Sequence, residues 1–508
     1  MIPVTLAEVA AATGGRLDGG ADPAALVTSV VVDSRLVEPG ALFVALPGAR
    51  VDGHGFAAAA VATGAAAVLA ARPVDAPAVL VADPAAGLMA LAAHVRGLAK
   101  ATVLAVTGSS GKTTTKDLLA DLLGTLGETI APPGSFNNEI GLPLTLLRFE
   151  ETTEYAALEM GARGIGHIAA LCAIARPQVG LVLNVGSAHV GGYADGRAGI
   201  ARAKGELAEA ATDTVVLNAD DPLVLAMRSR AAGRVRVVTF GLADGADVRA
   251  ERVEIDRAGR ASFDLLAGGE RHRVALALVG GHQVSNALAA AAAAVAVGMT
   301  PAAAAAALAA ARPRSRWRME VTTAPSGVVI VNDAYNANPE SMRAALRALV
   351  DLGQAPADPA APADTADLAD TADLAEMGDP GGVDDASAAA DASSDGRRRR
   401  WTWAVLGPMA ELGAVADDEH AELGRFAAAL GIDRVLAVTD AARPLAAAAA
   451  AAGGHATWVG GVDEAAAALA AAGLRAGDVV LVKASRSYGL ERLAQALAAA
   501  GTNRGGNR

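Results

Sequence analysis

The sequence predicts an α/β protein of three domains, with strands and helices alternating along most of its 508 residues. At about 150 residues per domain, this length suggests about three hydrophobic cores. Apolar residues make up 53% of the chain and aromatic residues only 3%, so we expect cores built largely from small side chains. Short apolar runs that lead through Gly-containing turns into helical patterns are typical of parallel strands alternating with helices.

The first domain is expected over residues 1–100. The segment Val30–Leu46 predicts a strand, a polar turn, a Pro-Gly turn and a second strand. Residues Asp52–Phe56 then start an Ala-rich helix. Polar residues in these turns can hold a ligand, although exposed turn residues are more often merely solvated. The candidates are Ser34, Arg35 and His54.

The central domain, expected over residues 101–312, is organised around a strand, a Gly-rich turn and a helix. Thr102–Val106 predicts a buried strand, and Lys112 opens the helix after the turn. Such a turn binds phosphate because its backbone N–H groups point at the anion and the helix N-terminus adds partial positive charge. We therefore predict a P-loop ATPase-like parallel-sheet domain that binds ATP. Its phosphate-binding residues are Gly108, Ser109, Ser110, Gly111, Lys112, Thr113 and Thr114.

The general Walker pattern is not met, because Val106 stands where that pattern has its first glycine. Polar residues also follow later strands: Glu159 ends one strand, and His189 follows another. Ligands bind at the carboxyl ends of strands in an open parallel sheet, so these two can converge with Thr113 on a metal-nucleotide site. The alternatives are a surface carboxylate and a loop histidine. Lys204, on the next helix, can instead form a surface ion pair. Its candidate partners are Glu206 and Glu209.

The third α/β unit is expected over residues 313–508. A strand at Gly327–Asn332 runs into the turn D-A-Y-N-A-N-P and a helix. Residues 354–400 interrupt this unit with an acidic, Pro-containing segment that repeats a hexamer, TADLAD then TADLAE. Because this segment has almost no large apolar residues, we predict a disordered insertion. The fold is expected to resume at Trp401.

Charge and composition exclude several classes of protein. The net charge is −12, but eleven acidic residues and no basic one lie between Gln354 and Gly396, so the remainder is nearly neutral. Nucleic-acid binding therefore has no electrostatic basis. The single cysteine, Cys172, excludes an internal disulfide and suits a reducing cytosol; we interpret it as a small buried residue rather than a nucleophile.

No targeting or membrane segment is evident in the sequence. The start, MIPVTLAEV, lacks a basic leader, so we expect no signal peptide and a cytoplasmic location. The longest uncharged run, Val274–Ala311, is mostly alanine and is broken by polar residues, Gly298 and Pro301. We predict two packed helices there rather than a membrane span.

Six motifs occur outside the phosphate loop. They are SFNNEIGLPLTLL (Ser135–Leu147), EMGA (Glu159–Ala162), NVGSAHV (Asn184–Val190), NDAYNANPESM (Asn332–Met342), LGPMAELG (Leu406–Gly413) and VKASRSYGLE (Val482–Glu491). Together with the loop sequence T-G-x-x-G-K-T-T, they make the chain resemble the Mur ligase family over nearly its whole length outside the 354–400 segment. Two positions depart from the family pattern: Ala484 stands where glycine is usual, and Gln283 where asparagine is common.

This resemblance implies a three-domain architecture with a Rossmann-like C-terminal domain. It also implies ATP-dependent ligation of D-Ala-D-Ala to UDP-N-acetylmuramoyl-tripeptide through an acyl phosphate. Mg²⁺ would be held by Thr113 and Glu159, with His189 and a carbamylated Lys204 near a second ion, and Lys112, His189 and Lys204 would be catalytic. Asn286, Arg318 and Asp333 would contact the nucleotide. The substrate-binding residues would be Ser34, Arg35, His54, Asn137, Asn138, Asn336, Asn338, Lys483 and Ser485.

Two competing interpretations remain. A folylpolyglutamate synthase-like ligase shares the phosphate loop, but the motif NDAYNANP and the N-terminal turn Asp33–Arg35 argue against it. A nucleotide-binding scaffold without turnover would not need the predicted metal cluster. We expect a monomer, and the third residue of the tripeptide, diaminopimelate or lysine, stays open.

Overall fold

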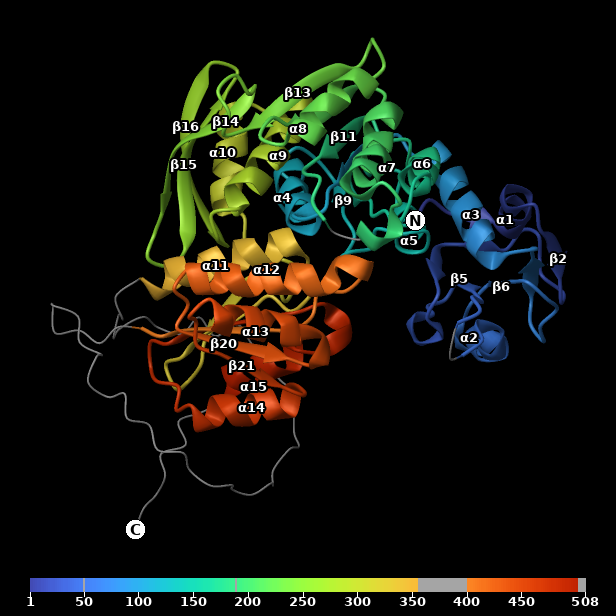
Figure 1. Cartoon of the computed structure of the whole chain (residues 1–508). Helices are drawn as coiled ribbons and strands as arrows, with labels where there is room; N and C mark the ends of the chain where they lie inside the picture. The colour runs from blue at the N-terminus through green and yellow to red at the C-terminus, as the bar shows by residue number, and fades with distance from the viewer. Residues whose placement is uncertain (49–50, 188–189, 355–399, 501–508) are drawn as a thin grey trace.

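The structure is a computed structural model that describes residues 1–48, 51–187, 190–354 and 400–500. The predicted disordered insertion therefore lies almost entirely outside the described residues. Within these residues, three large β-sheets with flanking helices follow one another along the chain (Figure 1), as the predicted α/β class requires. The limits of the predicted domains, at residues 100 and 312, remain predictions. No helix of the described residues is both long and apolar enough to cross a membrane.

The N-terminal sheet has five strands, of which only the edge strand β2 is antiparallel to its neighbour. A separate antiparallel pair, β1 with β3, lies beside helix α1, whose start is fixed by a capping box between Thr5 and Glu8. In order across the sheet, the strands are β2 (Arg16–Asp18), β7 (Ala78–Leu80), β6 (Ala67–Ala70), β5 (Ala41–Val44) and β4 (Ser29–Val31). The other strands and the α-helices here are β1 (Val4–Thr5), β3 (Leu26–Val27), α1 (Leu6–Thr13), α2 (Ala57–Thr63) and α3 (Pro84–Leu98).

The central sheet has nine strands. Seven of them are parallel, and β15 and β16 extend the sheet as an antiparallel hairpin. In order across the sheet, the strands are β16 (Glu270–Val279), β15 (Arg260–Ala267), β14 (Val248–Ile255), β13 (Arg236–Gly241), β12 (Thr214–Asn218), β11 (Val179–Val182), β8 (Thr102–Thr107), β10 (Tyr155–Glu159) and β9 (Thr129–Ile130). The helices are α4 (Lys112–Leu123), α5 (Gly141–Leu146), α6 (His167–Ala175), α7 (Gly196–Ala210), α8 (Pro222–Leu225), α9 (Gln283–Ala296) and α10 (Pro301–Ala310).

The prediction of two packed helices over Val274–Ala311 was wrong at its start. Residues up to Val279 belong to strand β16, and only α9 and α10 are helical. The burial of β16 alternates along much of its length, because one face of the hairpin packs on the core and the other is solvated. In VALALV both faces of the strand carry apolar residues, mainly alanine on one and larger residues on the other. The sequence therefore shows no alternation of polar and apolar residues that would have indicated a strand.

The C-terminal sheet has six strands, with only β17 antiparallel at one edge. Its first helix, α11, is capped by Asn338, whose side chain accepts a hydrogen bond from the backbone N–H of Ser341, and Pro339 occupies the first turn. In order across the sheet, the strands are β17 (Glu320–Thr323), β18 (Val329–Asn332), β22 (Val479–Lys483), β19 (Thr402–Leu406), β20 (Arg434–Val438) and β21 (Ala456–Val459). The helices are α11 (Pro339–Gly353), α12 (Ala416–Ala429), α13 (Arg443–Ala451), α14 (Val462–Ala471) and α15 (Glu491–Ala499).

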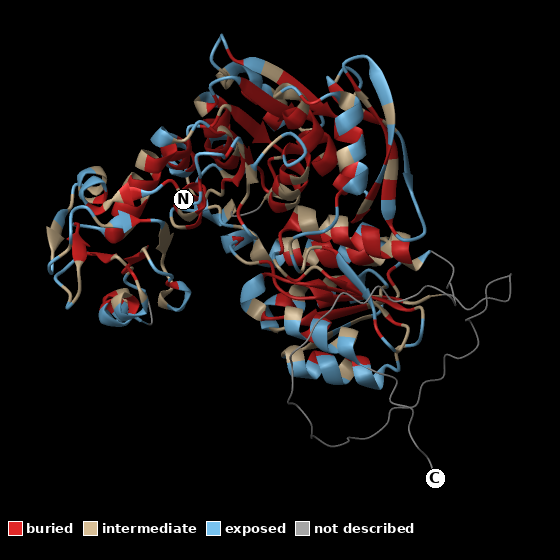
Figure 2. Cartoon of the chain, turned by 180° about the vertical axis from the view of Figure 1, so that it is seen from behind, coloured by how far each residue is buried: buried red, intermediate tan, exposed pale blue. Residues whose placement is uncertain are grey.

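Most of the strands form the buried interior of each unit, whereas edge strands such as β17 are exposed and many helices keep one exposed face (Figure 2). Helix α3 packs against α1 on the N-terminal side and against α5 and α6 on the central side. One hydrophobic cluster runs through α3 from the N-terminal sheet to the central sheet. On the other side of the molecule, α11 and α12 lie between the central sheet and the C-terminal sheet (Figure 1). The start of α11 is therefore brought close to the phosphate loop.

Candidate active site

The phosphate loop joins β8 to α4, and two glycines determine its shape. Gly111 has a φ of 81°, and a Cβ atom there would lie 2.3 Å from Oδ1 of Asn286. A Cβ atom on Gly108 would lie 2.9 Å from Cβ of Leu183. Only glycine therefore lets the loop pack so closely against α9 and the end of β11. Val106, where the general pattern has glycine, is a fully buried residue of β8.

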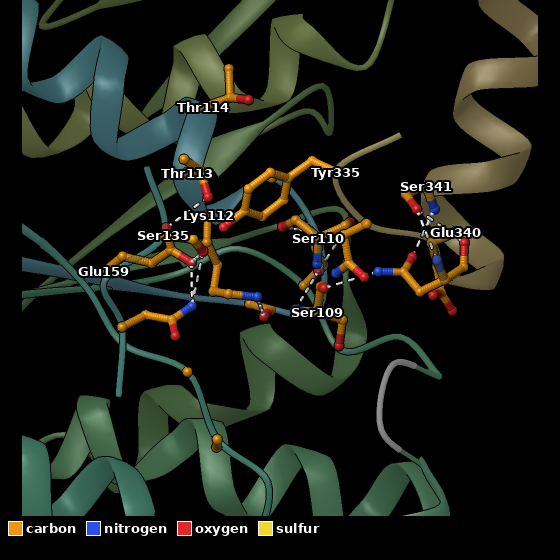
Figure 3. A pocket seen from close by; sticks show the side chains of 18 of the residues that line it. Ser109, Ser110, Lys112, Thr113, Thr114, Ser135, Glu159, Tyr335, Glu340 and Ser341 are labelled. Carbon is orange, nitrogen blue, oxygen red and sulfur yellow. Dashed lines mark hydrogen bonds between the residues drawn. The ribbon is translucent and has the colours of Figure 1, made fainter. Parts of the chain in front are cut away.

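A cavity of about 650 Å³ opens at this loop, between the central and C-terminal sheets (Figure 3). Most of the residues predicted for the site line this one cavity. They are Gly108, Ser109, Ser110, Gly111, Lys112, Thr113, Thr114, Asn137, Asn138, Glu159, Lys204, Asn286, Arg318, Asp333, Asn336, Asn338 and Lys483.

Glu159, at the end of β10, is held on both of its carboxylate oxygens. Oε2 accepts a hydrogen bond from the Thr113 hydroxyl at 2.7 Å. Oε1 accepts from the Ser135 hydroxyl at 3.1 Å and from the Asn137 amide at 2.7 Å (Figure 3). Glu159 is only 1% exposed, so the surface-carboxylate alternative is wrong. A threonine hydroxyl and a carboxylate beside a phosphate loop are the oxygen donors that Mg²⁺ prefers.

Two lysines face the same cavity. The Lys112 ammonium donates a hydrogen bond to the carbonyl of Gly108 at 2.9 Å, and burial lowers its pKa, although the nearby carboxylate of Glu159 opposes that shift. Lys204, on α7, is 6% exposed. Burial, together with the positive charge of Lys112, holds the pKa of Lys204 well below the usual range of a lysine. An ammonium group is costly in such surroundings, so a larger fraction of Lys204 is neutral amine than for an ordinary lysine.

The surface ion pair considered for Lys204 is not formed, because both candidate partners are bound elsewhere. Glu206 accepts hydrogen bonds from the backbone N–H groups of Gly166 and Ala169. Glu209 is bound by Arg230 at 2.8 Å. His189 lies outside the described residues. In the part of the chain that the structure describes, no three His, Cys, Asp or Glu side chains form a metal-binding group.

The C-terminal side of the cavity is built around a buried ion pair. The Lys483 ammonium, 2% exposed, lies 2.7 Å from Oδ2 of Asp333 and donates a further hydrogen bond to the carbonyl of Asn336 at 2.8 Å. Arg318 lies over the ring of Tyr335, with its guanidinium carbon 4.3 Å from the ring centre. Asp333 therefore organises this wall, and Tyr335 orients the arginine.

Asn336 and Asn338, two of the predicted substrate residues, lie in the turn after β18, and Ser485 lies beside that turn. Asn338 caps α11 and donates a hydrogen bond to the carbonyl of Ser109 at 3.3 Å. Ser485 lies behind the cavity wall, where its hydroxyl accepts from the backbone N–H of Ala410 at 2.9 Å. On the central side, Asn138 accepts from the backbone N–H of Gly141 at 2.8 Å and so shapes the loop before α5.

The three N-terminal candidates do not line the cavity. Ser34 and Arg35 follow β4, and His54 follows β5, so all lie toward the carboxyl edge of the N-terminal sheet. Arg35 binds Asp33 at 2.6 Å and holds the pKa of that partly exposed carboxyl at about 2. His54 is largely buried, donates from Nδ1 to Asp52 at 2.6 Å and accepts from the backbone N–H of Ala71 at Nε2.

Sequence reasoning missed several residues that line the cavity, notably His282, Tyr335 and Glu340. Three buried polar atoms here have no hydrogen-bond partner among the described residues: Nε of Arg318, Nδ1 of His282 and Oε2 of Glu340. Burial lowers the pKa of His282 to about 4, so its ring is neutral. Buried polar atoms of this kind indicate a site that a ligand completes. The position of His282 between a strand and a helix was the signal that could have revealed it.

The fold and the phosphate loop define a nucleotide-phosphate-binding α/β protein, and comparison with known proteins identifies its family. Sequence profiles match residues 26–96 (Mur ligase family, catalytic domain), 106–294 (Mur ligase middle domain) and 379–486 (Mur ligase, glutamate ligase domain). The chain is 43% identical to the UDP-N-acetylmuramoyl-tripeptide--D-alanyl-D-alanine ligase of Mycobacterium tuberculosis, over 98% of each chain. It is 34% identical to the Escherichia coli enzyme of the same name, over 86% of each chain.

Solved structures agree with these relatives. MurF from Acinetobacter baumannii aligns with a TM-score of 0.80 at 29% identity, covering 98% of this chain and 99% of that one. The MurF ligase of Thermotoga maritima, solved in complex with ADP, aligns with a TM-score of 0.72 at 29% identity, covering 92% and 97%. The chain belongs to the Mur ligase family, and the predicted resemblance and three-domain fold class are confirmed.

Proposed function

We propose that this chain, an ATP-dependent ligase, joins D-alanyl-D-alanine to the terminal carboxylate of UDP-N-acetylmuramoyl-tripeptide and so forms the pentapeptide precursor of peptidoglycan. Full-length identity of 43% to ligases of that name is the observation that carries the proposal. The cavity supports this proposal, since one wall is a phosphate loop and the other carries a buried ion pair and Arg318, which precedes β17.

The reaction proceeds in two steps. A tripeptide carboxylate oxygen attacks the γ-phosphorus of ATP, ADP leaves, and an acyl phosphate forms. The amine of D-alanyl-D-alanine then attacks the acyl carbon, loses a proton and expels phosphate. Lys112 carries the positive charge that balances the transferring phosphoryl group. Exclusion of water from the cavity during the reaction would protect the acyl phosphate from hydrolysis.

Thr113 and Glu159 would hold Mg²⁺, because their oxygens already lie 2.7 Å apart beside the loop. Bound there, the ion would neutralise phosphate charge. Arg318 and Asn286 would contact the nucleotide, and the buried, unpaired Nε of Arg318 is a donor for it. Lys204 would act as a carbamate, and the N-terminal residues would hold the uridine diphosphate. The residues for this last role are Ser34, Arg35 and His54.

The test is release of ADP and phosphate from purified protein with ATP, Mg²⁺ and both substrates. We expect phosphate release to require UDP-MurNAc-tripeptide and D-alanyl-D-alanine together, with one amide product by mass spectrometry. Parallel reactions use tripeptides ending in diaminopimelate or in lysine, and the faster one identifies the third residue. Turnover with a folate and glutamate instead, or none with either pair, would contradict the proposal. Gel filtration with light scattering tests the expected monomer.

A further inference from the structure

Lys116 lies on α4, one turn beyond Thr113, and is one of the largest fully buried side chains in the described part of the molecule. It is 1% exposed, and it is not among the described residues that line the cavity. Burying an ammonium group costs several kcal/mol, on the order of a whole domain's stability margin, unless its donors are satisfied. The hydrogen-bond acceptors of the Lys116 ammonium group therefore indicate the role of this residue.

Lys116 binds a loop from another part of the central domain. Its ammonium donates to the carbonyl of Pro132 at 2.6 Å and to that of Gly134 at 3.2 Å, and it lies 2.6 Å from a carboxylate oxygen of Asp117. The three donors of the ammonium thus have three acceptors. Two of these acceptors belong to the segment Pro132–Gly134, which joins β9 to the polar residues before α5.

The residue after this segment is Ser135, which with Asn137 binds Oε1 of Glu159. Oε2 of the same carboxylate accepts from Thr113, on the same helix as Lys116. A ring of contacts therefore runs from Lys116 through the loop to Glu159 and back to α4. Pro132 and Pro133 restrict φ along the loop. Because the loop is stiff, holding it at Lys116 also fixes where Ser135 lies.

We propose that Lys116 is a positioning residue for the metal-nucleotide site. By holding the loop at Pro132 and Gly134, it keeps Ser135 and Asn137 on one oxygen of Glu159 and leaves the other oxygen turned to Thr113. It touches neither phosphate nor substrate. Its effect is on the orientation of a carboxylate that binds Mg²⁺, so this inference rests on the proposed function. Outer contacts of this kind are worth about 10- to 100-fold in metal affinity.

The test measures ADP binding to the full chain by calorimetry, in EDTA and in excess Mg²⁺. The ratio of the two dissociation constants isolates the metal's contribution. In Lys116→Met we expect this ratio to fall about tenfold, the lower end of the range for outer-shell contacts, with the affinity in EDTA unchanged. Lys116→Arg, which keeps a charged donor, should retain part of the ratio. Lys100→Met, at an exposed lysine, is the matched control and should behave as the wild type.

A merely structural role for Lys116 would lower the melting temperature and leave the ratio unchanged, and that result would overturn the inference. If Lys116→Met does not fold, the same ratio is measured in Lys116→Arg and Pro133→Gly. Pro133 is exposed, so its replacement by glycine loosens the loop while keeping Lys116. Wild-type ratios in both would overturn the inference. Failure of the wild-type chain to bind ADP at all would overturn the proposed function as well. The wild-type measurement therefore distinguishes failure of the proposed function from failure of the positioning role of Lys116.

Discussion

The side-chain amide of Asn338 lies 3.3 Å from the carbonyl oxygen of Ser109, so the first helix of the C-terminal sheet is hydrogen-bonded to the phosphate loop. Next to it, Glu340 accepts from the backbone N–H and the hydroxyl of Ser187, at 2.8 and 3.2 Å. The hydroxyl of Ser109 in turn accepts from the backbone N–H of Gly186. The start of α11 thus binds two loops of the central sheet in the arrangement that encloses the cavity.

Asn338→Asp separates this contact from the helix cap. Aspartate keeps the cap oxygen but places a carboxylate oxygen against the Ser109 carbonyl. The hydrogen bond, worth about 1 kcal/mol or roughly fivefold in an equilibrium, is lost, and repulsion is added. We expect the KM for ATP to rise by at least that factor with the melting temperature nearly unchanged. Asn338→Ala, the comparison variant, should in addition lose about 1 kcal/mol of stability through the cap. An unchanged KM in both variants would show that the contact does not matter for nucleotide binding.

Lys112→Ala removes a cation directed at charge that develops during phosphoryl transfer. We expect turnover to fall by a factor on the order of 10² or more. The variant should fold, because Lys112 makes only one hydrogen bond, to a backbone carbonyl of its own loop, that the structure records. Circular dichroism checks the fold, and phosphate release checks turnover. Near-normal turnover in the folded variant would mean that the phosphate loop has been assigned wrongly.

The phosphate loop and the polar strand ends were predictable because both obey local rules. A turn between a strand and a helix fixed the position of Lys112, and the parallel sheet brought Glu159 to the same edge. Lys116 was not predictable in this way. A lysine in an amphipathic helix pattern normally lies at the surface, and its burial here depends on a loop 16 residues away folding over it. Glu340 was missed for the same reason: its partner, Ser187, lies 153 residues away.

The thiol of Cys172 should be unreactive toward thiol reagents in the native protein. Burial, with a smaller effect from the negative charge of Glu206, raises the pKa of its thiol to about 12. The thiolate is the reactive form, so essentially none is present at neutral pH. We expect no reaction with a thiol reagent such as DTNB until the chain is unfolded in guanidinium, and one thiol per chain thereafter. Fast labelling of the native protein with loss of activity would contradict the interpretation as a buried apolar residue.

Lys204 is expected to act as a carbamate. Because its pKa is held well below the usual range by burial and by Lys112, a larger fraction of the side chain is neutral amine at pH 7 than for an ordinary lysine. The neutral amine reacts with CO₂, losing a proton and forming an N–C bond. The product is a carbamate whose two oxygens share one negative charge, in place of a positive ammonium group. The carbamate oxygens are ligands that Mg²⁺ accepts, whereas an ammonium is not.

Lys204→Ala should therefore be almost inactive, and a small carboxylic acid in excess should partly restore turnover by occupying the vacated oxygen positions. An exposed lysine would behave differently, since its ion pairs are worth only about 0 to 1 kcal/mol. Addition of ¹³C-bicarbonate gives a direct readout: the wild type should show a carbamate carbon by ¹³C NMR that Lys204→Ala lacks. Full activity in the alanine variant, or identical spectra for the two proteins, would eliminate the carbamate.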